Sequence, residues 1–153
     1  MGKFAHKTPR LNTINLELKD FDAYIDGEFN IENLELSFSF FFELKEKNTL
    51  QIFIHLQHFY KTTDENEEEG KLSLQHSDHL IDFEFEENQD ISQGFDVEYL
   101  AHLLGTSIIM VKGFYDSLTK GNELNAAALP IFNPMELVES RYKDEIKDDI
   151  LII

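Results

Sequence analysis

Residues 34–57, LELSFSFFFELKEKNTLQIFIHLQ, decide the fold because they contain two stretches of alternating apolar and polar side chains. The stretches cover residues 34–44 and 50–57, and both carry most of their apolar side chains at even positions. An alternation with a period of two places one set of side chains on one face of a strand. The polar connection between them, residues 45–48, is short enough for a hairpin. This region therefore predicts two long antiparallel strands that share an apolar face.

A first strand is predicted before this hairpin. Residues 11–20 alternate in the same way, and Ile14, Leu16 and Leu18 form the expected apolar face. Residues 1–10 show no periodicity, so we expect a flexible N-terminus.

A fourth strand is predicted after the hairpin, with an irregularity inside it. The acidic stretch TTDENEEEG at residues 62–70 cannot contribute to a core, so we expect a solvated loop there. Beyond it, Leu72 and Leu74 lie at even positions, whereas the apolar side chains from Ile81 onwards lie at odd positions. One face can stay buried only if a bulge or bend interrupts the strand, and we expect it at the polar residues 77–79.

A long helix follows the strands. Apolar residues recur at three-and-four spacing between Asp96, which can cap a helix, and Gly121, which predicts a helix over about residues 96–120. Its apolar stripe can cover the sheet. Gly105 and Gly113 interrupt the pattern and weaken the helix, so they should mark a bend or a close approach of another backbone.

A second helix completes the predicted plan. Asn133 followed by Pro134 is typical of a helix start, and we expect a helix over about residues 134–149. All strands lie within residues 11–88 and both helices follow them, which indicates an α+β fold: a four-stranded antiparallel sheet covered by a long helix, with a second C-terminal helix. Residues 11–153 are expected to form a single domain, because a chain of 153 residues gives two domains too little core each.

Composition excludes several functions. Thirty acidic against 13 basic residues leave a formal charge of −17, which opposes binding to nucleic acid. The absence of cysteine excludes disulfides, cysteine-ligated metals and thiol catalysis. No uncharged apolar stretch reaches the length of about 18 residues that a membrane helix needs, and the first residues lack the apolar run of a signal peptide. We expect a cytoplasmic protein without membrane insertion.

Histidines are the most tempting chemical feature. His55 and His58 form one His-x-x-His pair, and His76 and His79 form another, in adjacent predicted strands. Four converging histidines would suit zinc, and a metal enzyme or small hydrolase is one hypothesis for this chain. However, residues three apart in a strand point to opposite faces, which favours solvated or cross-strand-paired histidines. The chain has no G-x-S-x-G motif and no glycine-rich phosphate loop, so we predict no enzyme and no cofactor.

Surplus aromatic residues are the remaining feature, because 14 of the 153 residues are phenylalanine. Phe41 and Phe53 lie opposite the main apolar faces of their strands, and Phe59 shares the phase of Phe53. The second helix or a second copy of the chain could cover them. A contiguous exposed patch with an acidic rim would instead mark a surface for partners. We therefore name Phe41, Phe53, Phe59 and Tyr60 as candidate contacts for a bound polypeptide, with the long helix as one wall of a groove.

Three C-terminal segments carry a family resemblance: EYLAHLLG at 98–105, KGFYDSLTKG at 112–121 and LPIFNPMEL at 129–137. Together with the order of the strands before them, these segments resemble the SecB-like export chaperones. The resemblance extends over about residues 11–139. No single residue in these motifs performs chemistry.

The resemblance implies a cytoplasmic chaperone without enzymatic activity. SecB-like proteins are tetramers built as dimers of dimers, hold preproteins unfolded along aromatic-lined grooves, and deliver them to the SecA translocation ATPase; some members serve toxin–antitoxin pairs. The family motif Lys-Asp-x-Ser-Phe-Glu corresponds to residues 19–24, so the resemblance implies that Asp20 faces SecA, whereas Tyr24 replaces the glutamate. The stretch from Gly105 to Lys120 is shorter than in export SecB and lacks its Phe-Pro-Tyr-Ala-Arg segment. The resemblance therefore implies a divergent relative of this family.

Two hypotheses of different classes remain beside the metal enzyme. The first is a homo-oligomeric holdase for unfolded polypeptides, because excess phenylalanine supplies apolar contacts and the charge of −17 keeps loaded particles apart. The second is a dedicated interaction module, such as an antitoxin-type or assembly partner that recognises one protein. The apolar C-terminal tail, residues 150–153, would suit either burial or an interface.

Overall fold

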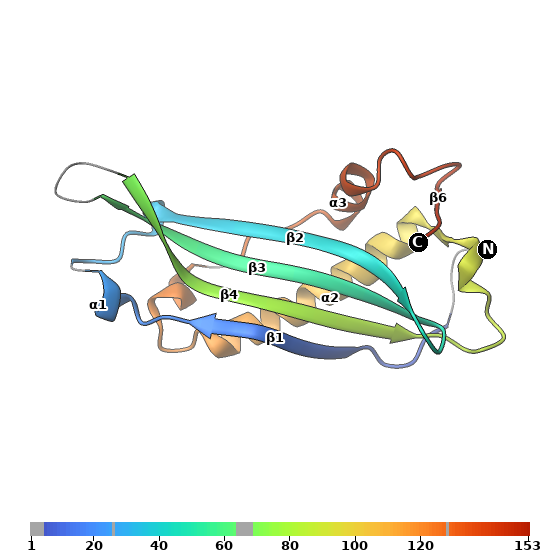
Figure 1. The fold of residues 1–153 in the computed structure, drawn as a ribbon, viewed down its shortest axis with the longest axis horizontal. Coiled ribbons are helices and arrows are strands. Elements are labelled where there is room, and N and C mark those ends of the chain that lie inside the picture. The colour runs from blue at the N-terminus through green and yellow to red at the C-terminus, as the bar shows by residue number, and fades with distance from the viewer. Residues whose placement is uncertain (1–4, 26, 64–68, 128) are drawn as a thin grey trace.

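The computed structural model describes residues 5–25, 27–63, 69–127 and 129–153. They form a four-stranded antiparallel sheet in the order β1-β4-β3-β2, and the long helix α2 crosses one of its faces (Figure 1). A shorter helix, α3, packs against α2. The predicted α+β architecture is therefore confirmed. The main elements are β1 (Arg10–Leu18), β2 (Leu34–Lys45), β3 (Thr49–Thr63), β4 (Glu69–Glu84), α2 (Val97–Leu118) and α3 (Pro134–Arg141).

Short strands and helices connect the main elements. Two-residue strands β5 and β6 pair with each other, which ties the C-terminal tail to the start of α2. Leu151 of this tail is buried, whereas Ile152 is exposed. The short elements are α1 (Phe21–Tyr24), η1 (Ile31–Asn33), η2 (Ile91–Gln93), β5 (Phe95–Asp96), η3 (Glu123–Ala126) and β6 (Ile150–Leu151).

Two segments expected to lack regular structure fall partly outside the described residues. These are residues 1–4 of the N-terminus and residues 64–68 of the acidic stretch. The N-terminal residues that are described contact β4: the Lys7 backbone N–H donates to the Glu84 carbonyl at 2.9 Å, and the His6 ring lies edge-on to Phe83.

The core lies between the sheet and α2. Its apolar side chains come from alternate positions of the central strands and from one stripe of the helix, as the two periodicities predict. Burial of one such side chain contributes about 1.5–3 kcal/mol. The side chains with no measurable exposure include Leu50, Ile52, Ile54, Ile81, Phe83, Leu100, Leu103 and Leu104.

The predicted hairpin is confirmed. β2 pairs with β3 without interruption from Leu34 opposite Tyr60 to Lys45 opposite Thr49. The turn between them has Lys47 and Asn48 in the left-handed region, with φ of 62° and 57°. The Asn48 side-chain amide donates to the carbonyls of Glu86 and Gln89, which fixes the turn against the chain beyond β4.

The prediction for the apolar face of β1 was wrong. Ile14 and Leu16 are 38% and 45% exposed, and the register against β4 shifts between Ile14 and Glu17. The alternation before the bulge places Leu11 and Thr13, rather than Ile14, on the core side of the sheet. A bulge at Asn15, whose φ is 52°, then shifts the register, so that Leu18 faces the core. An asparagine tolerates this conformation better than most residues. Only Leu18 of the expected set packs against the core.

The irregularity between β3 and β4 exists, but not at residues 77–79. The register shifts between His58 and Phe59, which face Gln75 and Ser73, so Leu74 is the additional residue. Its side chain is buried and its carbonyl accepts from the Lys19 backbone N–H at 2.8 Å. The bulge therefore produces the change from even to odd apolar positions that the sequence requires. It lies three residues before the expected position.

Gly105 and Gly113 were both expected to mark a bend or a close approach; Gly105 marks a close approach, whereas Gly113 has no neighbour within 4 Å of an added Cβ atom. A Cβ atom at Gly105 would lie 3.2 Å from Cγ of Pro134, so the missing side chain lets the start of α3 approach α2. Asn133 caps α3 by accepting from the backbone N–H groups of Met135 and Glu136. No helix in the described ranges is both long enough and apolar enough to span a bilayer.

α3 is shorter than expected, because it ends at Arg141 rather than near residue 149. Tyr142 leaves the helix and stacks on Phe42 of β2, with ring centroids 5.4 Å apart. Asp148 and Asp149 then adopt φ of 53° and 62°, which turns the chain into β6. Pairing with β5 thus takes the place of the last turns of the predicted helix.

Gly113 provides a test of these assignments. It lies on the exposed side of α2 and a Cβ atom there would meet nothing within 4 Å. Gly113→Ala is therefore expected to raise the free energy of unfolding by about 0.5–1 kcal/mol. Gly105→Ala must displace Pro134 and should gain less or lose stability. Chemical denaturation of both variants measures the difference, and equal gains would contradict the close approach at Gly105.

Candidate functional site

The sheet has one face that none of the described helices covers (Figure 1). Both α2 and α3 lie on the other side, so α3 does not cover the surplus aromatic residues. Phe41 of β2 pairs with Phe53 of β3, and Phe53 pairs with Leu80 of β4, which gives an apolar row across three strands. The rings of Phe41 and Phe53 stack at 4.7 Å, and Phe41 remains 38% exposed.

The other two aromatic candidates do not join this row. Phe59 lies on the same open face, but the positions of His55 and Gln57 separate it from Phe53. It lies instead beside the Lys71 ammonium, which is 5.9 Å from its ring centroid. Tyr60 is buried on the helix-covered face at 4% exposure, and its hydroxyl accepts from the Asn30 backbone N–H. Tyr60 is therefore not part of the open surface.

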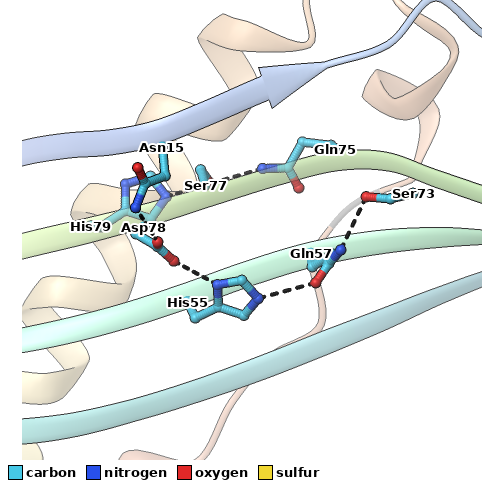
Figure 2. A network of polar contacts seen from close by, with 8 residues as sticks. All are labelled: Asn15, His55, Gln57, Ser73, Gln75, Ser77, Asp78 and His79. Atoms are coloured by element: carbon cyan, nitrogen blue, oxygen red, sulfur yellow. Dashed lines mark hydrogen bonds and ion pairs between the residues drawn. The ribbon is translucent and has the colours of Figure 1, made fainter.

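A hydrogen-bonded network borders the apolar row (Figure 2). Asp78 accepts from Asn15 at 2.9 Å and pairs with Nδ1 of His55 at 2.6 Å. Nε2 of His55 lies 3.2 Å from the Gln57 carbonyl oxygen, and the Gln57 amide donates to Ser73. Burial raises the pKa of Asp78, but the bonds from Asn15 and His55 outweigh it and hold the pKa below its usual value. The network orders polar side chains from three strands on the open face.

The four histidines are divided between the two faces of the sheet. His55 and His76 occupy the open face, whereas His58 and His79 are buried under α2. Three of them form the expected cross-strand pairs: His55 with Asp78, His58 with Gln75, and His79 with Thr13. Within the described part of the chain, the histidines do not gather ligand atoms for a metal ion.

Asp20 belongs to a small acidic group. The carboxylates of Asp20, Asp22 and Glu123 lie within 4.8 Å of one another at the surface. Asp20 also caps α1 by accepting from the Asp22 backbone N–H at 3.2 Å. The cap gives Asp20 a local structural role, and exposed carboxylates at this spacing do not by themselves form a metal site.

The outer edge of β2 is partly open. The Phe42 backbone N–H points away from β3 and donates to the Tyr142 hydroxyl at 2.8 Å. Backbone groups alternate in direction along a strand, so the N–H and carbonyl groups of Leu36, Phe38 and Phe40 also point outward. Among the described residues, these groups have no hydrogen-bond partner. Tyr142 therefore closes one end of an edge that is otherwise free.

An apolar groove lies on the helix side of the molecule, and Phe132 connects it to β2. It has a volume of about 230 Å³ and lies between α2 and the segment that leads into α3. Phe132 from this segment lines the groove and stacks on Phe38 of β2 at 4.4 Å. Ile109 and Ile131 project from the groove walls with 72% and 101% exposure. We call the combination of Phe41 and Phe53, the free edge of residues 36–40, and this groove the β2 margin.

Sequence reasoning found only the open-face part of the β2 margin. It selected Phe41 and Phe53 from their phase but missed Ile109, Ile131 and Phe132. A signal was available, because residues 129–134 combine apolar side chains with two prolines, and a segment rich in proline seldom enters a sheet or helix interior. Its position beside β2 depends on a contact between distant segments that no local pattern contains.

No family model matches this chain, and neither a curated protein nor a solved structure matches it.

Proposed function

We propose that the protein is a SecB-like chaperone that holds unfolded polypeptides in extended form along the β2 margin. The observation that carries the proposal is the free outer edge of β2, with Phe41 on the open face beside it and Phe132 stacked on Phe38 on the helix side. The sequence resemblance to SecB-like export chaperones supports the same class. In this proposal the protein acts in the cytoplasm without cofactor or catalytic residue.

Backbone groups give the margin its tolerance for different clients. An extended polypeptide can add a strand to a sheet edge through main-chain hydrogen bonds, which do not depend on sequence. Leu36, Phe38 and Phe40 provide the outward N–H and carbonyl groups for such pairing. A dedicated partner of one folded protein would not need this feature.

Side chains of the client would alternate between two apolar surfaces. Successive residues of a strand point to opposite faces of a sheet. One set of client side chains would therefore lie near Phe41 and Phe53, and the other set near the groove with Ile131 and Phe132. Apolar surface on both sides provides affinity for the hydrophobic segments that an unfolded protein exposes.

Net charge supports the same class of function. A formal charge of −17 keeps loaded particles apart and attracts basic segments of a client, more weakly as salt rises. The resemblance further supports a homo-oligomer, a dimer of dimers, and delivery to SecA through the surface near Asp20. A mass measurement in solution and a binding assay with SecA test these two finer proposals.

Charge substitutions at the margin test the proposal. Wild-type protein at stoichiometric concentration is expected to suppress aggregation of several unrelated unfolded proteins. Phe41→Asp and Ile131→Asp each place a charge where client side chains would lie, so each should weaken suppression about fivefold or more, because burial of an unpaired charge costs several kcal/mol. Light scattering during refolding measures the effect.

Ile152→Asp is the matched control, because it adds the same charge at an exposed isoleucine of the C-terminal tail. This variant should suppress aggregation as well as wild type. Full activity of both margin variants would contradict the proposed surface. Binding of a single folded partner, without activity toward the client panel, would instead support the dedicated interaction module.

A further inference from the structure

A second chain of polar side chains runs through the buried interface between the sheet and α2. His79 lies 2.8 Å from the Thr13 hydroxyl through Nδ1 and 2.8 Å from the Ser77 hydroxyl through Nε2. The Gln75 amide donates to Ser77 at 2.7 Å, and its carbonyl oxygen accepts from His58 Nδ1 at 2.9 Å. Figure 2 shows the part from Gln75 through Ser77 to His79.

Each hydrogen bond in this series of polar side chains can contain only one hydrogen atom. With the Gln75 amide as a donor to Ser77, the Ser77 hydroxyl donates to Nε2 of His79, and Nδ1–H of His79 donates to Thr13. His79 is therefore neutral, with one donor and one acceptor nitrogen. A second proton on His79 would point at the Ser77 hydroxyl, whose own hydrogen would then need another acceptor. Among the described residues, Ser77 has no such acceptor and is 1% exposed.

Rings of α2 lie directly on the two buried histidines. Tyr115 stacks on His58 with centroids 5.1 Å apart, and Phe114 lies edge-on to His79 at 5.4 Å. These two residues belong to the C-terminal half of α2. The N-terminal half is held by leucines in the apolar core instead, including Leu100 and Leu104. Charge at the histidines would therefore affect one half of the helix.

We propose that this buried chain is an acid-sensitive latch, in which protonation of His79 and His58 releases the C-terminal half of α2 from the sheet while the N-terminal half stays in place. Released residues 111–118 would expose their apolar side and the covered face of the sheet beneath them. This switch is independent of the function proposed for the β2 margin.

Neighbouring charges fix the pH range. Burial lowers the pKa of His79 to about 4; the Asp78 carboxylate opposes this shift, and His55 adds to it. Burial also lowers the pKa of His58. From α2, the Tyr115 ring lies on His58 while its hydroxyl donates to the Leu124 carbonyl, and the Asp116 carboxylate is exposed. β1 contributes the uncharged Thr13.

The direction of the pH effect follows from these shifts. Because an unfolded histidine titrates near pH 6.5, the released state binds more protons than the closed state below this pH. The closed state is therefore fully favoured above about pH 6.5 and loses its advantage as the pH falls toward 4. The opening should precede general acid unfolding, since carboxylates titrate near pH 4.

Hydrogen exchange measured by mass spectrometry tests the latch. After correction for intrinsic exchange, residues 111–118 of the wild type should lose protection about tenfold between about pH 7 and pH 5, whereas residues 98–107 should not. His79→Gln cannot take up the proton and should lose less than about threefold. His102→Gln, at an exposed histidine in the N-terminal half of α2, is the matched control and should behave as the wild type.

Three results would overturn the latch: unchanged protection of residues 111–118, equal loss along all of α2, or a full loss in His79→Gln. An NMR titration of the wild type provides a second measurement that does not require the variant to fold. The His79 ring should remain neutral at about pH 6, where an unshifted histidine is more than half protonated. A protonated His79 at that pH would refute the proposal.

Discussion

Gln75→Leu is expected to lower the free energy of unfolding by about 2–3 kcal/mol, because it leaves a buried donor without a partner. Nδ1 of His58 has the Gln75 carbonyl oxygen as its acceptor, and His58 is 2% exposed. Ser77 loses the amide donor at the same time. Leucine fills a similar volume, so the loss reports the hydrogen bonds rather than a cavity. Chemical denaturation near neutral pH measures it.

Gln57→Leu is the matched control on the opposite face of the sheet. Gln57 also bonds a histidine and a serine, His55 and Ser73, but its side chain is partly exposed (Figure 2). Water can replace both bonds, so this substitution should cost less than about 1 kcal/mol. Similar losses in the two variants would show that burial does not decide the cost.

Gly94→Ala should be the most damaging single-methyl substitution, with an expected loss of about 3 kcal/mol. Gly94 has φ of 99° and ψ of 177°, a conformation that residues with a side chain rarely adopt. A Cβ atom would also lie 2.8 Å from Cγ2 of Ile150 and 2.9 Å from the Leu151 carbonyl oxygen. The pairing of β5 with β6 would have to open. Thermal unfolding and exchange of the C-terminal amides measure both effects.

Gly27→Ala separates the cost of backbone strain from the cost of a steric clash. Gly27 has φ of 115°, but a Cβ atom there would meet nothing within 4 Å. Only the backbone strain remains, so the loss should be about 1–2 kcal/mol. If Gly94→Ala cost no more than Gly27→Ala, the contacts of Gly94 with the tail would not contribute to stability.

The elements that could be predicted from sequence are those with a local signal. The hairpin of β2 and β3 follows from alternation on both sides of a short polar connection, and α2 follows from three-and-four spacing with Asp96 and Gly121 at its ends. Gly105 was correctly assigned to a close approach, since a helix retains an internal glycine at a cost. These signals need no knowledge of distant residues.

The errors arise where distant contacts override a local pattern. Alternation through Ile14, Leu16 and Leu18 looks like one buried face, but Ile14 lies opposite Asp78 on the open face of the sheet. The bulge at Asn15, whose side chain bonds Asp78 across the sheet, turns only Leu18 toward the core. The helix predicted to residue 149 stops at Arg141 because Tyr142 reaches β2 and Ile150 reaches β5. Neither contact can be recognised from the sequence of its own segment.

The candidate surface divides in the same way. Phe41 and Phe53 were recognised because strand phase alone places them opposite the core. Tyr60 follows Phe59 by one residue, and one step along a strand reverses the face, so the Tyr60 side chain points inward. The free edge of β2 could not be predicted, because sequence does not show which strand lies at the border of a sheet.

The contact between Tyr142 and Phe42 has one more consequence, for self-assembly into fibres. A long, phenylalanine-rich border strand is the usual starting point for endless stacking of identical chains. The Tyr142 hydroxyl occupies a donor that such stacking would require, and the aromatic ring blocks the adjacent space. The backbone groups of Leu36, Phe38 and Phe40 remain free to pair with another strand, but the formal charge of −17 on each copy opposes stacking of identical chains.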